Sequence, residues 1–519
     1  MKKIFKISLV IFSLVVLVMT GVLLYYKEKR LEKKREDSYN INILENGGNG
    51  NIIKNIEKKK EKNNTQQSNN FDQINKVILV TIDTLRADHL GYMGYPYNTS
   101  PFLDKLAEKS IVFKKAYTVI PTTASAEASI FTSLYPINHR STNNYEILDD
   151  SFLTMAEIFK ENGYKTAAFV SVKHILWNNL DQGFDIFNIP QKEKIYRNAD
   201  ETIGLAVNWL DEQLMDDKFF LWIHLYDPHF PYNIPDKDLS ILTEDSSSRE
   251  GFFVFLTENQ NISTNIFKDN KKDNLIDAIS EYDKEILFLD YQLKNFYNYV
   301  EERNFNKNTF WTITSEHGEG LGGHDFYEHV GRLYEEQLLT PIIFHFPSSI
   351  FIEPSTIDRM VENIDILPTF NDILGFSMEK QKGTIQGISL LPLILNKASY
   401  ENDGRVFSWT GKIRGGQREG SPAVKYTDQA SWTGEKFAIQ NNEFKYIYNL
   451  KNDIKDEFYN IKKDPLEKNN LIDFNAKEKD QLREILFQKI NQLIEDSSTK
   501  NQYVDEKFYN DLESLGYFK

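Results

Sequence analysis

The stretches VILVTIDTLRADHLG at residues 77–91 and WTITSEHGEGLGGHDFYEH at residues 311–329 decide how this chain folds. Each is an apolar run that ends in a group of carboxylates and imidazoles. In α/β proteins, ligands bind outside the carboxyl ends of parallel strands, where acidic and histidine side chains can hold a metal ion. The two stretches lie far apart in the sequence, so they share a site only if their strands are close in one sheet. Together they predict a hydrolase or transferase that acts on an anionic ester.

Composition narrows the class of protein further. The chain has 519 residues, of which 40% are hydrophobic, and this is enough for a large α/β core. Its net charge of −15 argues against a general nucleic-acid binder, because a phosphate backbone needs a basic surface. An anionic small substrate is still compatible with that charge, because a bound divalent cation reverses the local field. The chain has no cysteine, which excludes disulfides, thiolate zinc sites and cysteine nucleophiles.

The N-terminal region reads as a membrane segment followed by a stalk. Residues 7–26 carry no charge, and a helix of that length spans ~30 Å, about one hydrocarbon thickness. No clear small-x-small cleavage site is present, so residues 1–26 are expected to be an uncleaved signal anchor rather than a removed signal peptide. Residues 27–72 are rich in Lys, Asn, Glu and Gln and predict a polar flexible stalk.

The remaining sequence alternates apolar runs with helical patterns. This alternation predicts an α/β fold in which a large, mostly parallel sheet lies between helices. We expect a catalytic domain over 73–400, with a polar insertion at about 233–275 that could act as a lid. A smaller C-terminal α+β subdomain is expected over 401–519, with a final helix near 476–495. The predicted strands are 76–83, 166–172, 219–224, 309–315, 342–346, 436–439 and 444–448, and a helix is predicted after the start signal Ser100-Pro101.

Several segments, taken together, resemble the sulfatase family within the alkaline-phosphatase superfamily. They occur in the family's order and cover roughly residues 77–475. The resemblance implies an alkaline-phosphatase-like fold, whereas a fold by itself does not settle the reaction. The segments are DTLRADHLG (83–91), SPFLDKLAEKSIVFKKAYT (100–118), TTASAEASIFTSLYP (122–136), HLYDPHFPY (224–232), YDKEILFLD (282–290), TSEHGEGLGGHDFYEH (314–329), NIDILPTF (363–370), and FKYIY (444–448) with DEFYNIKKDPLEKNNL (456–471).

The resemblance implies a metal site made by Asp83, Thr123, Glu316 and His317. Carboxylate and imidazole ligands suit Mn²⁺, Mg²⁺ or Zn²⁺, and Ca²⁺ is also compatible. The chain departs from the family pattern at two of these places. Thr84 stands where sulfatases often have a second aspartate, and Glu316 replaces the usual aspartate. From the residues alone, Asp83 could instead form a turn and Glu316 could cap a surface loop.

The nucleophile position separates phosphate from sulfate chemistry. Formylglycine-dependent sulfatases have Cys or Ser nine residues before the Thr of a T-G-x-Y-P stretch, and here that position is Thr123. Threonine cannot be oxidised to an aldehyde, but a threonine hydroxyl beside a metal ion can attack phosphorus. Phosphoethanolamine and phosphoglycerol transferases of this superfamily use threonine in this way. Ser125 is the alternative nucleophile, while Glu127 and Ser133 replace the arginine and glycine of the family pattern.

Three histidines are candidates for proton transfer. His229, in DPHFPY, matches a family histidine that assists the leaving group, and imidazole titrates near neutral pH. His324 and His329 follow the second metal segment, and either could bind the transferred oxyanion or protonate the leaving oxygen. A lone histidine can also be structural, and His224 is expected to be buried support.

The predicted function is a membrane-anchored, metal-dependent, sulfatase-family hydrolase or transferase of phosphate or sulfate esters. Two alternatives stay open: a true sulfuric ester hydrolase that uses Ser125, and an inactive sulfatase-like protein that binds a glycan or a partner. The membrane segment favours envelope lipids or glycans as substrates, and nucleic acid is not an expected partner. The resemblance to the sulfatase family implies that the catalytic domain lies outside the cytoplasm, in the periplasm or outside the cell.

Overall fold

The first deciding stretch forms β1 (Lys76–Ile82), which lies in the middle of the larger sheet. A computed structural model describes residues 71–191, 194–232, 275–327, 329–376, 385–397, 400, 402–410, 436–450 and 454–496. All seven residues of β1 are buried. A strand covered on both faces has a continuous apolar run rather than an alternating one, and KVILVTI fits that pattern.

The larger sheet of the described part has eight strands in the order β4-β3-β5-β1-β6-β7-β2-β8. Its neighbours pair in parallel except at β7, which is antiparallel to both β6 and β2. The predicted large, mostly parallel sheet is confirmed. It is a mixed sheet, because β7 runs antiparallel to both of its neighbours. The other strands are β2 (Ile111–Tyr117), β3 (Lys165–Val170), β4 (Ile186–Asn188), β5 (Phe219–Leu225), β6 (Thr309–Thr314), β7 (Leu339–His345) and β8 (Ser355–Glu362).

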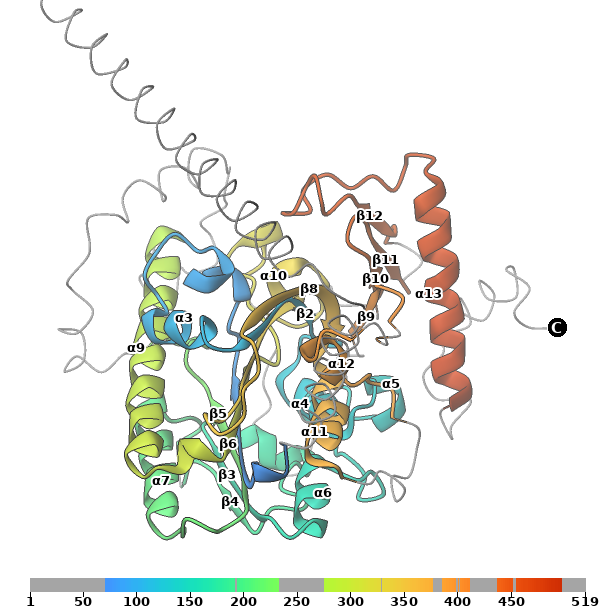
Figure 1. Cartoon of the computed structure of the whole chain (residues 1–519). Coiled ribbons are helices and arrows are strands. Elements are labelled where there is room, and N and C mark those ends of the chain that lie inside the picture. Colours follow the sequence, from blue (N-terminus) through green and yellow to red (C-terminus); the bar gives the residue numbers. More distant parts are fainter. Residues whose placement is uncertain are drawn as a thin grey trace, which may run out of the picture. The chain divides into compact units, whose positions relative to one another are not determined.

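Helices cover both faces of this sheet (Figure 1). Side chains alternate along β1, so Val77 and Leu79 enter one core, whereas Ile78 and Val80 enter the other. The first core is closed by α4 (Thr123–Thr132), α6 (Met155–Glu161), α11 (Ile366–Leu374) and α12 (Leu391–Ile394). The second is closed by α3 (Pro101–Ala107), α7 (Ala199–Asp211) and α9 (Leu275–Glu302), and α3 begins with proline as its start signal predicts.

A second, antiparallel sheet follows near the C-terminus, in the order β12-β11-β10-β9. Helix α13 (Lys477–Asp496) lies along it (Figure 1), and Leu486 and Phe487 of this helix share a core with Tyr446 and Tyr448. The predicted short strands and final helix are confirmed. The strands are β9 (Val406–Thr410), β10 (Lys436–Gln440), β11 (Lys445–Asn449) and β12 (Glu457–Tyr459). Two further short helices, α5 (Pro136–His139) and α10 (Glu335–Leu338), come earlier in the chain.

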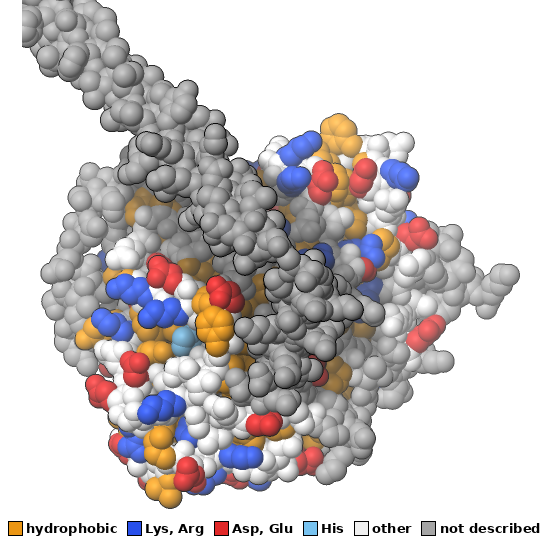
Figure 2. Space-filling model, viewed as in Figure 1, with side chains coloured by type: hydrophobic (Ala, Val, Ile, Leu, Met, Phe, Trp, Pro, Cys, Tyr) orange, Lys and Arg blue, Asp and Glu red, His pale blue; other side chains and the backbone are white. Residues whose placement is uncertain are grey.

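Some predictions concern residues that the structure does not describe. The expected anchor over 1–26, the stalk up to residue 70 and residues 233–274 of the expected insertion lie outside the described residues. Among the helices that are described, none combines the length and the apolar character needed to cross a bilayer. Acidic and basic side chains are interspersed over the described surface of the face that Figure 2 shows.

Tyr282 of α9 holds the loop that leaves β1. Its hydroxyl donates to the carbonyl of Thr84 at 2.7 Å and accepts from the backbone N–H of Arg86 at 2.9 Å. The Tyr282 side chain is fully buried, and Thr84 has a φ of 55°, which is unfavourable for a β-branched residue. One phenol therefore pairs a buried carbonyl and a partly buried N–H, and it keeps a strained turn in place directly after Asp83.

We expect Tyr282→Phe to lower the free energy of unfolding by about 1–3 kcal/mol, because it leaves a buried backbone acceptor and a partly buried donor unpaired. Urea denaturation followed by circular dichroism measures this change. Tyr299→Phe is the matched control: it removes the same hydroxyl from the same helix, but that hydroxyl pairs with Asp211 at an exposed position. Equal losses in the two variants would contradict the role given to Tyr282.

Candidate active site

Three adjacent parallel strands bring the candidate metal ligands to one edge of the sheet. Thr81 of β1 is in register with His224 of β5 on one side and with Thr314 of β6 on the other. Asp83 follows β1 directly, and Glu316 lies two residues beyond β6. Because parallel strands end at a common edge, these three side chains meet although they are far apart in the sequence.

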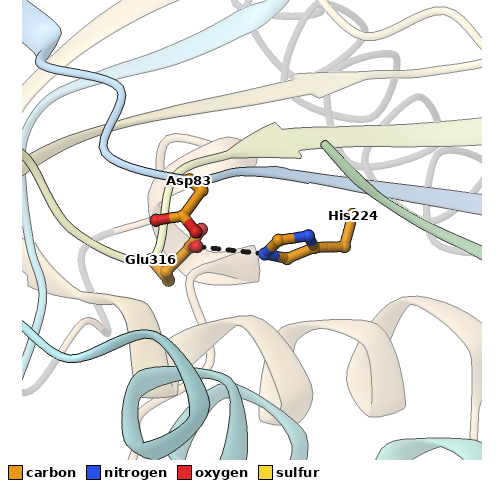
Figure 3. Close-up of side chains that lie close together, drawn as sticks. All are labelled: Asp83, His224 and Glu316. Carbon is orange, nitrogen blue, oxygen red and sulfur yellow. Dashed lines mark hydrogen bonds and ion pairs between the residues drawn. The ribbon is translucent and has the colours of Figure 1, made fainter. Parts of the chain in front are cut away.

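Asp83, His224 and Glu316 form a tight, buried cluster. Their possible ligand atoms all lie within 4.8 Å of one another, and Figure 3 shows the three side chains pointing toward one another. His224 Nε2 lies 3.2 Å from Glu316 Oε1. Both carboxylate oxygens of Asp83, Oε2 of Glu316 and Nδ1 of His224 are buried without a hydrogen-bond partner among the described residues. Unpaired buried oxygens of this kind are costly unless a cation or a donor satisfies them.

The electrostatics of the cluster also indicate that its buried oxygens need a cation or a donor. Burial, followed by the charge of Glu316, raises the pKa of Asp83 well above its ordinary value. Two carboxylates that face each other away from water repel unless positive charge lies between them. A set of carboxylate oxygens and imidazole nitrogens fits Mn²⁺, Zn²⁺ or Mg²⁺, so the residues present are compatible with the divalent metal that the resemblance implies.

His317 connects this cluster to Thr123. Its Nδ1 lies 2.9 Å from the carbonyl oxygen of Gly318, which can only accept, so Nδ1 carries the proton and Nε2 is bare. Nε2 lies 3.8 Å from Asp83 Oδ1 and 3.2 Å from Thr123 Oγ1. Burial, followed by the charge that His329 can carry, lowers the pKa of His317 well below its ordinary value, so the ring is neutral near pH 7.

Thr123 is the first residue of α4 and is almost fully buried. The backbone N–H groups of a helix N-terminus favour negative charge, so this position suits an oxygen that becomes anionic. The small residues of TASAEAS let the start of the helix lie close to the sheet. The four predicted ligands Asp83, Thr123, Glu316 and His317 are therefore brought together by two strand ends, those of β1 and β6, and the start of α4.

Two of the three predicted proton-transfer histidines lie beside this cluster. The ring centroid of His329 is 4.5 Å from that of His317 and 4.9 Å from that of His229. His329 Nδ1 lies 3.3 Å from Glu319 Oε2, which stabilises a protonated ring. His229 donates from Nδ1 to the carbonyl of Phe230, and burial is the main cause that lowers its pKa well below the ordinary value.

The structure does not bring His324 to the same place. Its Nδ1 lies 3.4 Å from Glu336 Oε1 and its Nε2 lies 3.0 Å from the carbonyl of Glu467. The ring stacks on Tyr334 with centroids 3.6 Å apart. We therefore do not carry forward the predicted catalytic role of His324, because its own partners occupy both ring nitrogens.

Sequence reasoning missed the position of two residues. His224, expected to be buried support, lies in the metal-type cluster, and Glu127 is fully buried with both oxygens lacking a partner of good hydrogen-bond geometry. The available signal for His224 was its place at the end of FFLWIHL, where polar residues are unusual in a fully buried strand. Recognising that signal requires knowing that β5 lies next to β1.

Comparisons with known proteins agree with this geometry. The family model described as Sulfatase matches residues 75–376, which is more than half of the chain. The chain is 27% identical to the ulvan-active sulfatase of Formosa agariphila over 62% of this chain and 65% of that protein. It is 25% identical to an arylsulfatase of Clostridium perfringens over 80% of this chain and 94% of that protein.

Among solved structures, the chain resembles the phosphonate monoester hydrolase of Agrobacterium radiobacter. The TM-score is 0.64 at 19% identity, over 80% of this chain and 95% of that one. This likeness establishes the fold as alkaline-phosphatase-like. The family match over the region that contains Asp83, Thr123, Glu316 and His317 goes further, and on it the chain belongs to the sulfatase family.

Proposed function

We propose that this sulfatase-family protein is a metal-dependent hydrolase or transferase of phosphate esters that uses Thr123 as its nucleophile. The observation that carries the proposal is the position of Thr123 Oγ1, buried at the start of α4 and 3.2 Å from His317 Nε2. Thr123 cannot become a formylglycine, so the hydroxyl itself must react. A hydroxyl at a helix N-terminus beside a carboxylate–imidazole cluster suits phosphoryl transfer.

A divalent cation held by Asp83, Glu316, His317 and Thr123 would supply Lewis acidity and lower the pKa of the neighbouring hydroxyl. The protein's own groups carry out the remaining steps. The deprotonated Thr123 oxygen forms a bond to phosphorus while the bond from phosphorus to the leaving oxygen breaks. Protonated His329, held by Glu319, gives its proton to that leaving oxygen.

The second step releases the phosphoryl group and restores the site. Neutral His329 takes a proton from a water molecule or an acceptor alcohol while the oxygen of that molecule attacks phosphorus. The bond between phosphorus and Thr123 breaks, and the threonine oxygen returns to its starting state. The expected anchor at residues 1–26 favours a location on the membrane, and therefore an envelope lipid or glycan as substrate. The resemblance to sulfatases favours a catalytic part outside the cytoplasm.

A sulfate ester is the second candidate substrate, and a specific observation favours it. The relatives of Formosa and Clostridium are named sulfatases, and the Ser125 hydroxyl is buried without a partner among the described residues. Ser125 lies two residues beyond Thr123 on α4, and this spacing turns the two side chains to different sides of the helix. Phosphate-ester chemistry at Thr123 and sulfate-ester chemistry at Ser125 therefore predict opposite effects of removing the two hydroxyls on activity.

We expect Thr123→Ala to lower kcat on p-nitrophenyl phosphate or bis-p-nitrophenyl phosphate at least about 10³-fold, because it removes the attacking oxygen. Ser125→Ala is the matched control and should stay within about threefold of wild type, since it removes a hydroxyl that the reaction does not use. Steady-state rates with added Mn²⁺ measure both. Release of sulfate from p-nitrophenyl sulfate that survives Thr123→Ala and is lost in Ser125→Ala would establish the sulfatase alternative instead.

The loss of rate in His329→Ala is expected to depend on the leaving group. With p-nitrophenol, which leaves easily as an anion, the loss should be small; with an alkyl phosphate it should reach about 10²–10⁴-fold, the usual contribution of a general acid. His324→Ala removes an imidazole from the same loop and should change neither rate by more than about threefold. A loss in His329→Ala that is equal for both leaving groups would rule out proton donation by this ring.

A further inference from the structure

A cavity of about 460 Å³ adjoins the loop of residues 315–329 but is separate from the candidate active site. None of the candidate metal ligands lines it, and neither do the two histidines beside them. Two lining residues hold the loop: Arg86 Nη1 donates to the carbonyl of Glu319 at 3.1 Å, and the N–H of Glu319 donates to the carbonyl of Glu336 at 3.1 Å. The volume lies in the range of small-molecule sites, about 300–1,000 Å³.

A β-bulge brings two consecutive lysines of β2 to this cavity. Between Phe113 and Ala116 the pairing of β2 with β7 shifts by one residue. Lys114 and Lys115 lie within that bulge, and both line the cavity. Adjacent side chains of a regular strand point to opposite faces, so it is the bulge that allows both lysines to lie on one side.

The other walls come from the turn between β10 and β11 and from the loop that follows β12. The turn contributes two asparagines, Asn441 and Asn442, and the loop contributes Lys462. Apolar side chains of the loop and of the large sheet complete the walls, so the cavity also suits a ligand with a carbon body. They are Leu339, Met360, Ile461, Pro465 and Leu466.

The carboxylates that line the cavity already have basic partners. Each of the four lies within 3.4 Å of a nitrogen of a basic side chain, so their charge is compensated locally. The pairs are Asp88 with Arg86 at 2.7 Å, Glu335 and Glu467 with Lys445 at 2.9 and 2.7 Å, and Glu336 with His324 at 3.4 Å.

Four side chains of the cavity keep unused hydrogen-bond donors. The ammonium groups of Lys114 and Lys462 have no hydrogen-bond or ion-pair partner among the described residues. Asn441 Oδ1 accepts from two backbone N–H groups at 2.9 Å, and Asn442 Oδ1 accepts from Lys115 Nζ at 2.9 Å, so their amide NH₂ groups are the parts left to bind a ligand. Two free cations and two amide donors are the partners that an anion with several oxygens requires.

We propose that this cavity binds a small organic anion, a phosphate or sulfate ester with a carbon body about the size of a sugar. Lys114 and Lys462 bind the ester oxygens, the amides of Asn441 and Asn442 donate hydrogen bonds, and the apolar walls pack against the carbon body. The site goes beyond the proposed function and does not depend on the reaction at Thr123, because the residues that line the cavity take no part in that reaction.

Isothermal titration calorimetry of the full chain with glucose 6-phosphate, glucose 6-sulfate and glucose tests the site. Every sample carries Thr123→Ala, so that a phosphate ester is not turned over. We expect binding of at least one ester and none of glucose. Lys114→Gln combined with Lys462→Gln should weaken that binding at least about tenfold, because charge-assisted hydrogen bonds are lost. Lys463→Gln is the matched control and should leave it unchanged, since Lys463 is exposed next to Lys462 but does not line the cavity.

Binding at the catalytic centre is the competing explanation. It would be weakened by His329→Ala and unaffected by the two lysine substitutions, whereas binding in the cavity should show the reverse. Lys114 and Lys462 are both exposed, so each single variant is expected to fold, and each should weaken binding about threefold or more. Affinity that is unchanged in the lysine variants, or no binding of either ester by the chain that keeps both lysines, would overturn the proposal and leave the proposed function intact.

Discussion

The structure depends on one electrostatic constraint. Carboxylates lie close together inside the protein, where water cannot solvate them, and they repel one another. Asp83 and Glu316 lie with His224 within 4.8 Å, and all three are fully buried. Hydrophobic burial of the central strands forces this arrangement, because the same apolar runs that build the core deliver the acids to its edge. The favourable free energy of burying β1, β5 and β6 offsets the repulsion.

The order of the strands makes this constraint specific. With β1 between β5 and β6, His224 lies level with Thr81 and Thr314, and Asp83 and Glu316 each lie two residues beyond that level. A shift of one residue in either pairing would turn His224 or Glu316 to the opposite face of the sheet, toward α7 and α9. The packing of Trp222 of β5 against Phe131 of α4, with ring centroids 4.6 Å apart, opposes such a shift. The hydrophobic core therefore determines the geometry of the polar site.

Two departures from the sulfatase pattern have structural explanations. Ser133 stands where the pattern has glycine and adopts a left-handed φ of 56°, which glycine would adopt without strain. Its hydroxyl donates to the carbonyl of Ile364 at 2.8 Å and accepts from the N–H of Gly387 at 3.2 Å, and these bonds offset the strain. Thr84 is similar: its φ of 55° is held by the hydrogen bond from Tyr282 to its carbonyl. Neither departure disrupts the positions of Asp83 and Thr123.

The sequence by itself determined β1, β3, β5, β6 and β7 of the large sheet, the family, and the placement of Asp83, Glu316 and His317 at strand ends, because buried strands leave continuous apolar runs and the polar residues after them are conspicuous. It did not predict β2, β4 and β8. Only the tertiary structure decided the roles open to His224, Glu127 and His324. His224 looks like any core histidine until β5 is known to neighbour β1, and Glu127 looks like a helix surface residue until α4 is placed on the sheet. His324 and His329 cannot be told apart by spacing, and it is the fold that turns one toward Glu336 and the other toward Glu319. The physical reason is common to all three: a side chain's chemistry is set by the charges around it, and non-local contacts bring those charges together.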